Sequence, residues 1–155
     1  MKDDLPPQRL GEIGLSNYPP YLMNRIMGRY NAAIRAEMGK LGLTTPKMRA
    51  LAVLSVMDGQ VIGQLAVHAI VEQSTLSRAL DSLQAEGLVR RQADPADSRA
   101  TRVFITEAGR AKFEVLWPHM AETYQAMFAG IEPEEAQAFV ATLLKIHDNI
   151  QKNEV

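Results

Sequence analysis

The stretch DPADSRATR, residues 94–102, concentrates acidic and basic side chains in a chain whose formal net charge is only -1. Asp97 and Arg99 stand two residues apart, so a charge-assisted hydrogen bond between them could hold the guanidinium in one position. A positioned guanidinium loses less side-chain entropy on binding an anion than a free one does. The alternative is a solvated surface ion pair, which contributes roughly 0–1 kcal/mol to stability and has no function.

A second group of polar side chains occurs earlier, in the stretch QSTLSRALDSLQAEG, residues 73–87. Leu76, Leu80 and Leu83 recur at helical spacing and predict one apolar face, and Gly87 suits the position that ends such a helix. The other face carries hydrogen-bonding side chains, namely Gln73, Ser74, Thr75, Ser77 and Arg78. We therefore expect an amphipathic helix that presents donors and acceptors to a partner or to solvent.

The composition excludes several classes of protein. The 155 residues include no cysteine, which removes disulfides, thiolate metal sites and cysteine nucleophiles. No apolar run approaches the roughly 20 residues of a membrane span, and the N-terminal stretch MKDDLPPQRL lacks the apolar core of a signal peptide. We expect a cytoplasmic protein with one domain, or with one core and an appended helical part.

An enzyme is the least favoured class. The sequence contains no convincing serine–histidine–acid set, no glycine-rich phosphate loop and no metal-ligand spacing. His68, His119 and His147 fall on three different expected helices, and none is paired with another histidine at helical spacing. Only assembly of the folded chain could bring them together, so we expect no metal and no cofactor.

Apolar periodicity and helix-end signals predict the order of the elements. Helices are expected over 19–42, 44–59, 62–69, 73–87 and 106–130 and from Pro133 onward, with short strands over 88–93 and 101–106. Residues 94–100 would join the strands as the long tip of a hairpin. Residues 1–18 are polar and mixed, which is typical of a loose, flexible arm.

Two short helices that lead into a two-stranded hairpin predict a winged helix-turn-helix. The expected fold class is therefore mainly α with a two-stranded β wing. The winged domain, 43–105, is too small to cover the apolar stripes of the helices before and after it. We expect those helices, in 19–42 and 106–155, to form a dimerisation region by packing on each other and on a second copy of the chain.

Three stretches resemble the MarR family of bacterial transcription regulators. LTTPKMRAL (43–51) is similar to the start of the family's second helix, and QSTLSRALDSLQAEGLVRR (73–91) to its recognition helix and first wing strand. DPADSRATRVFITEAGR (94–110) is similar to its signature wing, in which Asp-x-Arg precedes a strand, a threonine and Glu-x-Gly-Arg. The last two stretches together are specific, and the order and length of the elements match over nearly the whole chain.

The resemblance implies a homodimer whose terminal helices form a base and whose two winged domains straddle a pseudopalindrome of double-stranded DNA. It also implies regulation, more often repression, that responds to a small ligand such as an aromatic acid or a phenol. Five aromatic residues could line a ligand pocket, although packing is the simpler role for each: Tyr18, Tyr21, Tyr30, Trp117 and Tyr124.

In this interpretation the recognition helix enters the major groove and the wing reaches the minor groove. Glutamine can pair with adenine, arginine with guanine, and serine or threonine with phosphate. Glu72 could cap the helix or accept a hydrogen bond from cytosine. The predicted DNA-binding residues are Gln73, Ser74, Thr75, Ser77, Arg78, Arg90, Arg91, Asp97, Arg99 and Arg102. Seven basic residues against six acidic ones over 72–112 leave little bulk charge, so arrangement must supply the binding.

Two positions depart from the family's pattern. The turn between the paired helices usually carries glycine, whereas Ile70 stands there in this chain. A β-branched residue is costly at positive φ, so we expect the turn to differ or the preceding helix to extend. Ser98 stands between Asp97 and Arg99, where the family often has another arginine, which removes one phosphate-binding charge per subunit.

A different function class stays open at this point. A winged-helix module used only for protein assembly would leave Arg78 and Arg99 dispensable and would show no salt-dependent binding to duplex DNA. We favour the ligand-responsive DNA-binding homodimer, because the helix face and the wing occur together.

Overall fold

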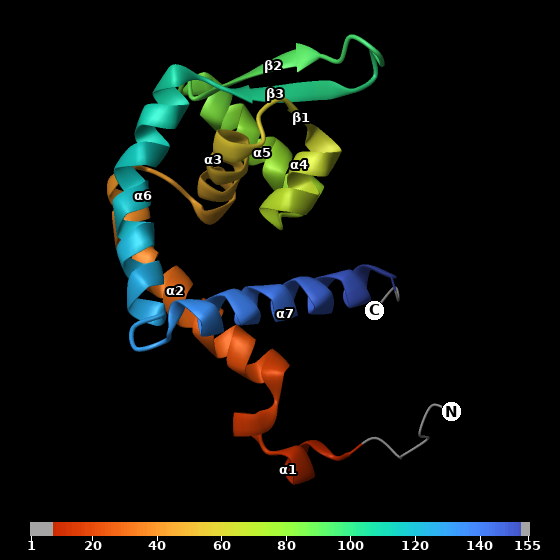
Figure 1. Cartoon of the computed structure of the whole chain (residues 1–155). Helices are drawn as coiled ribbons and strands as arrows, with labels where there is room; N and C mark the ends of the chain where they lie inside the picture. The colour runs from red at the N-terminus through yellow and green to blue at the C-terminus, as the bar shows by residue number, and fades with distance from the viewer. Residues whose placement is uncertain (1–7, 153–155) are drawn as a thin grey trace. The chain divides into compact units, whose positions relative to one another are not determined.

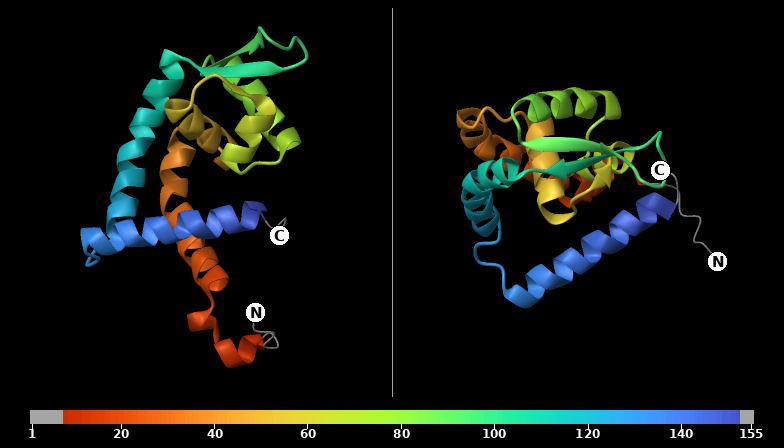
Figure 2. Two further views of the ribbon diagram at one scale, coloured as in Figure 1. Left: turned by 45° about the vertical axis from the view of Figure 1, so that its right-hand side comes forward. Right: turned by 90° about the horizontal axis from the view of Figure 1, so that it is seen from above.

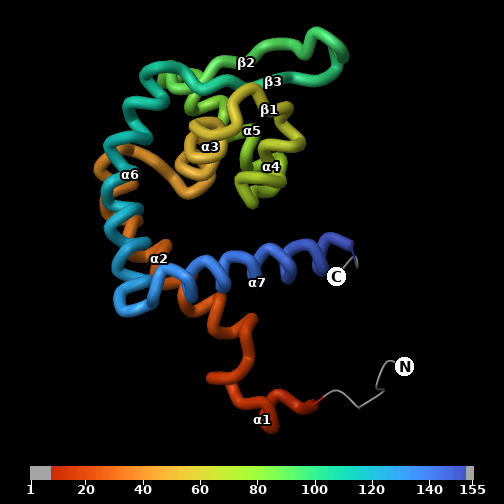
Figure 3. The backbone as a smooth tube through the Cα atoms, in the orientation of Figure 1, coloured from red at the N-terminus to blue at the C-terminus, as the bar shows by residue number. Residues whose placement is uncertain are grey.

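The computed structural model describes residues 8–152. The chain divides into two compact units, one up to Met120 and one from Ala121 onward. Figure 1 labels the elements, and Figure 3 follows the backbone through them. In the first unit they are α1 (Leu10–Ile13), the 3-10 turn η1 (Leu15–Asn17), α2 (Pro19–Lys40), α3 (Thr45–Val56), β1 (Gln60–Val61), α4 (Ile62–Ala69), α5 (Gln73–Ala85), β2 (Val89–Ala93), β3 (Thr101–Ile105) and most of α6 (Glu107–Met127).

The predicted fold class is confirmed, with one addition to the sheet. Strands β2 and β3 pair antiparallel, so that Val89 lies opposite Ile105 and Ala93 opposite Thr101. A third strand, β1, pairs with the other edge of β3. The predicted pairing of the two wing strands is confirmed, whereas β1 was not predicted, because its two residues are too few to show an alternating pattern.

The N-terminal stretch, predicted to be a loose arm, contains two short helical segments. Residues 10–17 form α1 and η1, and the Glu12 carboxylate accepts a hydrogen bond from the Arg9 backbone N–H. Residues 1–7 of that predicted arm lie outside the described residues.

One apolar core holds the first unit together. Helix α3 lies against α4, α5 and β3, and its Leu51 and Leu54 are fully buried. Helix α3, which is nearly all apolar, therefore occupies the middle of the core. Helices α2 and α6 add Ile34, Met38, Phe113 and Leu116 to the same cluster. The structure thus groups α2 and most of α6 with the winged helix-turn-helix.

The turn between α4 and α5 contradicts the expectation from the sequence. Helix α4 ends at Ala69, and Ile70 itself adopts the left-handed conformation with φ 55° and ψ 51°. The Ile70 N–H donates to the Val67 carbonyl and the Val71 N–H to the Ala66 carbonyl. These two bonds form the glycine-type helix end, so β-branching does not prevent the turn.

The second unit contains the end of α6 and helix α7 (Pro133–Lys152). Pro133 begins α7, and Glu134 and Glu135 lie in its first turn, where the helix dipole favours anions. The Phe128 ring contacts both Tyr124 and Phe139, with ring centroids 5.0 and 6.3 Å away. None of the helices in the described part of the chain is both long and apolar enough to cross a membrane.

Candidate nucleic-acid interface

Helix α5 places the five predicted polar residues on one surface. Leu76, Leu80 and Leu83 are completely buried against the core, so the helix cannot rotate without exposing them. Of all the predicted site residues, those that are exposed are Gln73, Ser74, Arg78, Arg90, Asp97 and Arg99, and those that are half-buried are Thr75, Ser77, Arg91 and Arg102. The N-terminal half of α5 is therefore available to a partner.

Glu72 takes the N-cap position of α5 and binds its two neighbouring hydroxyls. Its carboxylate accepts hydrogen bonds from Ser74 Oγ at 2.6 Å and from Thr75 Oγ1 at 3.3 Å. The Ser74 hydroxyl is the main cause of a lowered pKa of Glu72, with Thr75 and the charge of Arg78 adding to it. Because both hydroxyls donate to Glu72, their free lone pairs can accept hydrogen bonds.

The root of the wing is a network around Asp94, whose side chain is only 6% exposed. Asp94 Oδ1 accepts from the backbone N–H groups of Ala96 and Asp97, and Oδ2 accepts from Arg102 Nε. Arg102 Nη1 also donates to the Gly59 carbonyl at 2.8 Å. The Ala96 N–H, together with the Arg102 guanidinium, lowers the pKa of Asp94. Arg102, a predicted DNA-binding residue, is thus an internal support of the wing.

The tip of the wing differs from the predicted arrangement. Asp97 Oδ1 accepts a hydrogen bond from the backbone N–H of Arg99 at 3.0 Å, so the predicted bond from Asp97 to the guanidinium is wrong. Asp97 shapes the turn, as short polar side chains commonly do. Within residues 8–152 the Arg99 guanidinium makes no hydrogen bond or ion pair. Figures 1 and 2 show the tip of the β2–β3 hairpin extending past α3, α4 and α5 of the same unit.

The two arginines of β2 also bind within the chain. Arg91 Nη1 contacts Asp81 Oδ1 at 2.7 Å and Arg91 Nη2 donates to the Ser77 carbonyl, which joins β2 to α5. The Arg90 guanidinium lies over the Phe104 ring, 4.2 Å from its centroid, and donates to the Gln92 side chain. Arg91 therefore sets the position of the wing relative to the recognition helix, and Arg90 remains exposed.

Sequence reasoning missed the loop before β1, residues 57–59, which supports the wing through hydrogen bonds to β3. Asp58 Oδ1 accepts from the backbone N–H groups of Gly59 and Ile105, and Arg110 approaches Asp58 Oδ2 at 3.5 Å. Gly59 has φ +70°, and a Cβ there would lie 2.9 Å from the Phe104 ring. The dipeptide Asp58-Gly59 signals only a turn in the sequence, since its partners come from β3 and α6.

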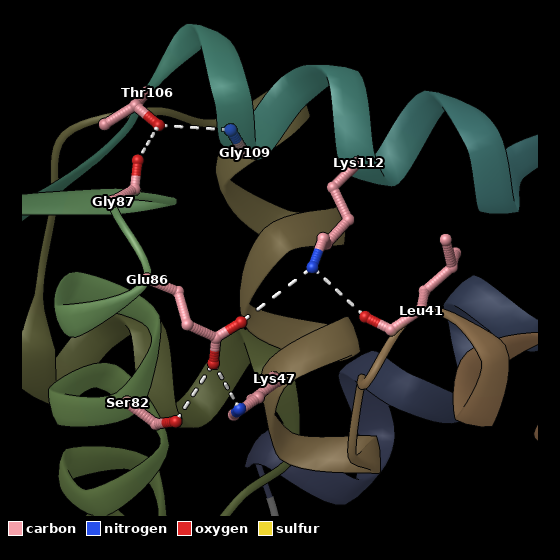
Figure 4. Close-up of polar contacts among 8 residues, drawn as sticks. All are labelled: Leu41, Lys47, Ser82, Glu86, Gly87, Thr106, Gly109 and Lys112. Atoms are coloured by element: carbon pink, nitrogen blue, oxygen red, sulfur yellow. Dashed lines mark hydrogen bonds and ion pairs between the residues drawn. The ribbon is translucent and has the colours of Figure 1, made fainter.

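Figure 4 shows how the end of the wing joins α6 and the C-terminal end of α5. Thr106 Oγ1 donates to the Gly87 carbonyl at 2.7 Å and accepts the Gly109 N–H at 3.1 Å, which caps α6. A Cβ on Gly109 would overlap the Leu88 carbonyl oxygen. The threonine and the glycine of the motif TEAGR thus have structural roles.

In the same view Glu86 joins three elements. Its Oε1 lies 2.6 Å from Lys47 Nζ in α3 and 3.1 Å from the Ser82 hydroxyl in α5, and its Oε2 lies 3.8 Å from Lys112 Nζ in α6. Lys112 also donates to the Leu41 carbonyl. The Lys47 contact is the main cause of a lowered pKa of Glu86. The cluster holds the C-terminal end of α5 in place, away from the polar residues of its N-terminal half.

The histidines lie in separate surroundings. His68 contacts Gln60, His119 lies near Glu37, and His147 lies near Asp148 and Gln151. Among residues 8–152 no group of three or more His, Cys, Asp or Glu could hold a metal ion.

Comparison with known proteins identifies the architecture. A family model described as MarR family matches residues 41–100. A crystal structure of a MarR-family transcriptional regulator from Silicibacter pomeroyi is 61% identical, covers 96% of this chain and 100% of its own, and superposes with a TM-score of 0.90. The chain belongs to the MarR family. It is a transcription regulator with a winged helix-turn-helix fold.

Two further relatives are more distant. The HTH-type transcriptional repressor IacR of Pseudomonas putida is 28% identical over 140 residues, which are 90% of this chain and 84% of IacR. BpsR of Bordetella bronchiseptica, whose DNA binding is regulated by 6-hydroxynicotinic acid, is 26% identical, with 83% of this chain and 98% of that one covered and a TM-score of 0.71. These relatives are regulators and not enzymes.

Proposed function

We propose that this MarR-family protein is a cytoplasmic, homodimeric repressor that binds pseudopalindromic double-stranded DNA, with α5 in the major groove and the wing in the minor groove. The observation that carries the proposal is the exposed polar face of α5, fixed by three buried leucines, in the same unit as a hairpin that projects an unpaired Arg99. A surface that met only solvent would need neither a polar face fixed by buried leucines nor an unpaired guanidinium on a hairpin held by the Asp94 network.

The contacts divide between direct readout and support. Gln73 and Arg78 are exposed near the N-terminal end of α5, where a recognition helix meets base edges. The hydroxyls of Ser74 and Thr75 donate to Glu72 and are left as acceptors, which suits the amino groups of adenine and cytosine better than phosphate oxygens. Arg91 and Arg102 contribute by holding the wing in place, and Arg99 enters the minor groove.

Exposed apolar helix faces support the dimer. Helix α7 has no buried residue in its described length, and α2 exposes Leu22, Ile26 and Met27. The exposed apolar residues of α7 are Phe139, Val140, Leu144, Ile146 and Ile150. Apolar stripes of this length normally pack against another surface, and a second copy of the chain would supply it.

A small aromatic acid is the effector class that the relatives favour, because 6-hydroxynicotinic acid regulates DNA binding by BpsR. Such a ligand would act by binding more tightly to a dimer whose recognition helices have the wrong spacing for DNA. Ligand and DNA would then weaken each other's binding by the same factor.

Fluorescence anisotropy on the duplex upstream of the protein's own gene, at two salt concentrations, tests the proposal. We expect saturable binding with a log–log salt slope well short of about 10, because the region 72–112 carries little excess charge. A slope near that value would contradict the contact set. Absence of salt-dependent duplex binding would favour the protein-assembly module instead, and loss of binding on addition of aromatic acids would report the effector class.

The variant Arg78→Ala tests whether Arg78 recognises bases or only the charge of the DNA backbone. We expect a loss of about fivefold to a hundredfold on the preferred duplex and a much smaller loss on a scrambled one, because a bidentate contact to guanine discriminates between bases. Arg35→Ala, which removes the same charge from an exposed position of α2, is the matched control and should leave both affinities unchanged. Equal losses on both duplexes would show that Arg78 contacts phosphate and not bases.

A further inference from the structure

Ile70 is the only non-glycine residue with positive φ among residues 8–152. The left-handed conformation is strained for any residue with a Cβ, and more so for a β-branched one. Burial of the side chain could offset that strain, but Ile70 is 78% exposed. The packing of the chain therefore gives no reason for isoleucine at this turn.

The backbone of the turn is held by bonds that do not require an isoleucine. The Ile70 N–H donates to the Val67 carbonyl at 3.2 Å, and the Val71 N–H donates to the Ala66 carbonyl at 3.1 Å. Arg49 Nη1 donates to the Ile70 carbonyl at 3.0 Å and joins the turn to α3. Glycine or asparagine could make the same backbone bonds with less strain. The side chain is what isoleucine adds, and strained residues of this kind occur preferentially at functional sites.

The position of Ile70 indicates what its side chain meets. The residue lies three positions before Gln73, in the turn that leads into the N-terminal end of α5. In a helix-turn-helix the first helix crosses the DNA backbone and the second enters the major groove, so this turn lies at the edge of the groove. Val67, three residues before Ile70 on α4, is also 71% exposed. The apolar groups that DNA presents in this region are the thymine methyl and the deoxyribose carbons.

We propose that Ile70 makes an apolar contact with DNA at the edge of the major groove, against a thymine 5-methyl group or the deoxyribose next to it. The proposal rests on the proposed DNA-binding function and adds a contact outside the recognition helix. It explains why the turn keeps a strained apolar residue. Removal of the side chain should therefore improve folding and weaken DNA binding.

Ile70→Asn and Ile70→Leu form the decisive pair of variants. Asparagine tolerates the left-handed conformation but lacks the apolar group, whereas leucine keeps the apolar group without β-branching. We expect Ile70→Asn to raise Tm by about 2–4 °C and to weaken binding to the duplex by about tenfold, since a dimer loses two contacts. Ile70→Leu should bind within about twofold of the parent, because it retains the apolar area.

A duplex with uracil in place of thymine distinguishes the two DNA groups. If the methyl group is the target, the parent should bind the uracil duplex about as weakly as Ile70→Asn binds the thymine duplex, and Ile70→Asn should not distinguish the two. If deoxyribose is the target, the parent should bind both duplexes equally and the loss in Ile70→Asn should persist on each.

Val56→Asn is the matched control, because Val56 is 84% exposed at the end of α3, outside the turn and α5. It should not change DNA affinity. A parent protein that binds duplex DNA together with an Ile70→Asn variant of unchanged affinity would overturn the Ile70 contact alone. A parent protein that binds no duplex DNA would instead overturn the proposed function, and the contact with it.

Discussion

The root and the tip of the wing carry the same types of charged residue and use them in opposite ways. At the root, Asp94 is almost completely buried and binds Arg102 and two backbone N–H groups. At the tip, the only hydrogen bond of the Asp97 carboxylate within the described residues is from the Arg99 backbone N–H, and the Arg99 guanidinium stays unpaired in the described chain. Charge that is satisfied within the chain shapes the hairpin, whereas charge left unsatisfied is available to an external anion.

The stretch 94–102 therefore contains both residues that support the hairpin and a residue that can contact DNA. A buried carboxylate is stable only if its hydrogen-bonding capacity is filled, and the root fills it. The arginine at the tip gains its main electrostatic interaction only when a phosphate-rich groove is present. Substitutions at the two places should therefore change different measured quantities.

Arg99→Ala should have the largest effect, and that effect should be on DNA binding. We expect the affinity to fall by about tenfold to a hundredfold on any duplex, with a salt slope smaller by about 2 per dimer, because each subunit loses one groove contact. Tm should not change, since the guanidinium has no partner within the described residues. The measurements are anisotropy at several salt concentrations and a thermal melt.

Arg29→Ala removes the same charge from an exposed position in α2 and should change neither quantity. A fall in Tm for Arg99→Ala would break the distinction between root and tip. It would mean that the tip arginine also supports the fold.

Asp94→Ala should have the next largest effect, and this one should be on stability. Removing the carboxylate leaves the Ala96 and Asp97 N–H groups and the Arg102 Nε–H without their acceptor, and the loss of several hydrogen bonds at a partly buried site is unfavourable. We expect Tm to fall by about 5 °C, with a smaller, indirect loss of DNA affinity.

Asp97→Ala is the matched substitution at the tip, in the same loop and of the same residue type. It should lower Tm much less, because its single bond lies in solvent. The double variant Asp94→Ala, Arg102→Met should recover part of the stability lost in Asp94→Ala, since it removes the arginine left without its partner. Equal melts for Asp94→Ala and Asp97→Ala would show that the root is no better anchored than the tip.

The smallest effect should be a pH dependence that comes from the root. The Ala96 N–H and the Arg102 guanidinium hold the pKa of folded Asp94 below its ordinary value of 3.8. A lowered carboxyl pKa contributes stability that is complete above the unfolded pKa and is lost as pH falls through the folded pKa. The contribution of Asp94 should therefore be constant near neutral pH, begin to fall below about pH 4 and be lost as pH passes through the lower folded pKa.

Urea midpoints of the parent and of Asp94→Asn, followed from neutral pH downward, measure that contribution as a difference. The difference removes the effects of Glu37, Glu72 and Glu86, whose pKa values are also lowered. The two curves should converge in acid. Parallel curves would show that ionised Asp94 adds nothing to the wing.

Much of the fold was predictable from local patterns. Leu76, Leu80 and Leu83 recur at helical spacing, and all three are fully buried. The hairpin followed from two short apolar runs around Pro95, and the MarR family from the wing and recognition-helix motifs. The turn at Ile70 was predicted wrongly, because propensity alone does not include the hydrogen bonds at the end of α4 and the bond from Arg49 that hold the strained conformation.

The sequence by itself determined the order of the longer helices and of the wing hairpin, the apolar face of α5 and the family, because these depend on periodicity and on residues close together in the chain. Only the tertiary structure decided which charges pair. The strand register places Gln92 opposite Arg102, and Arg102 binds Asp94. The ion pair that the sequence suggested, between Asp97 and Arg99, does not form. The partners of Asp58 and Glu86 come from distant elements, which no local spacing encodes. Long-range pairing therefore separates the residues that build the wing from Arg99, which remains available for DNA.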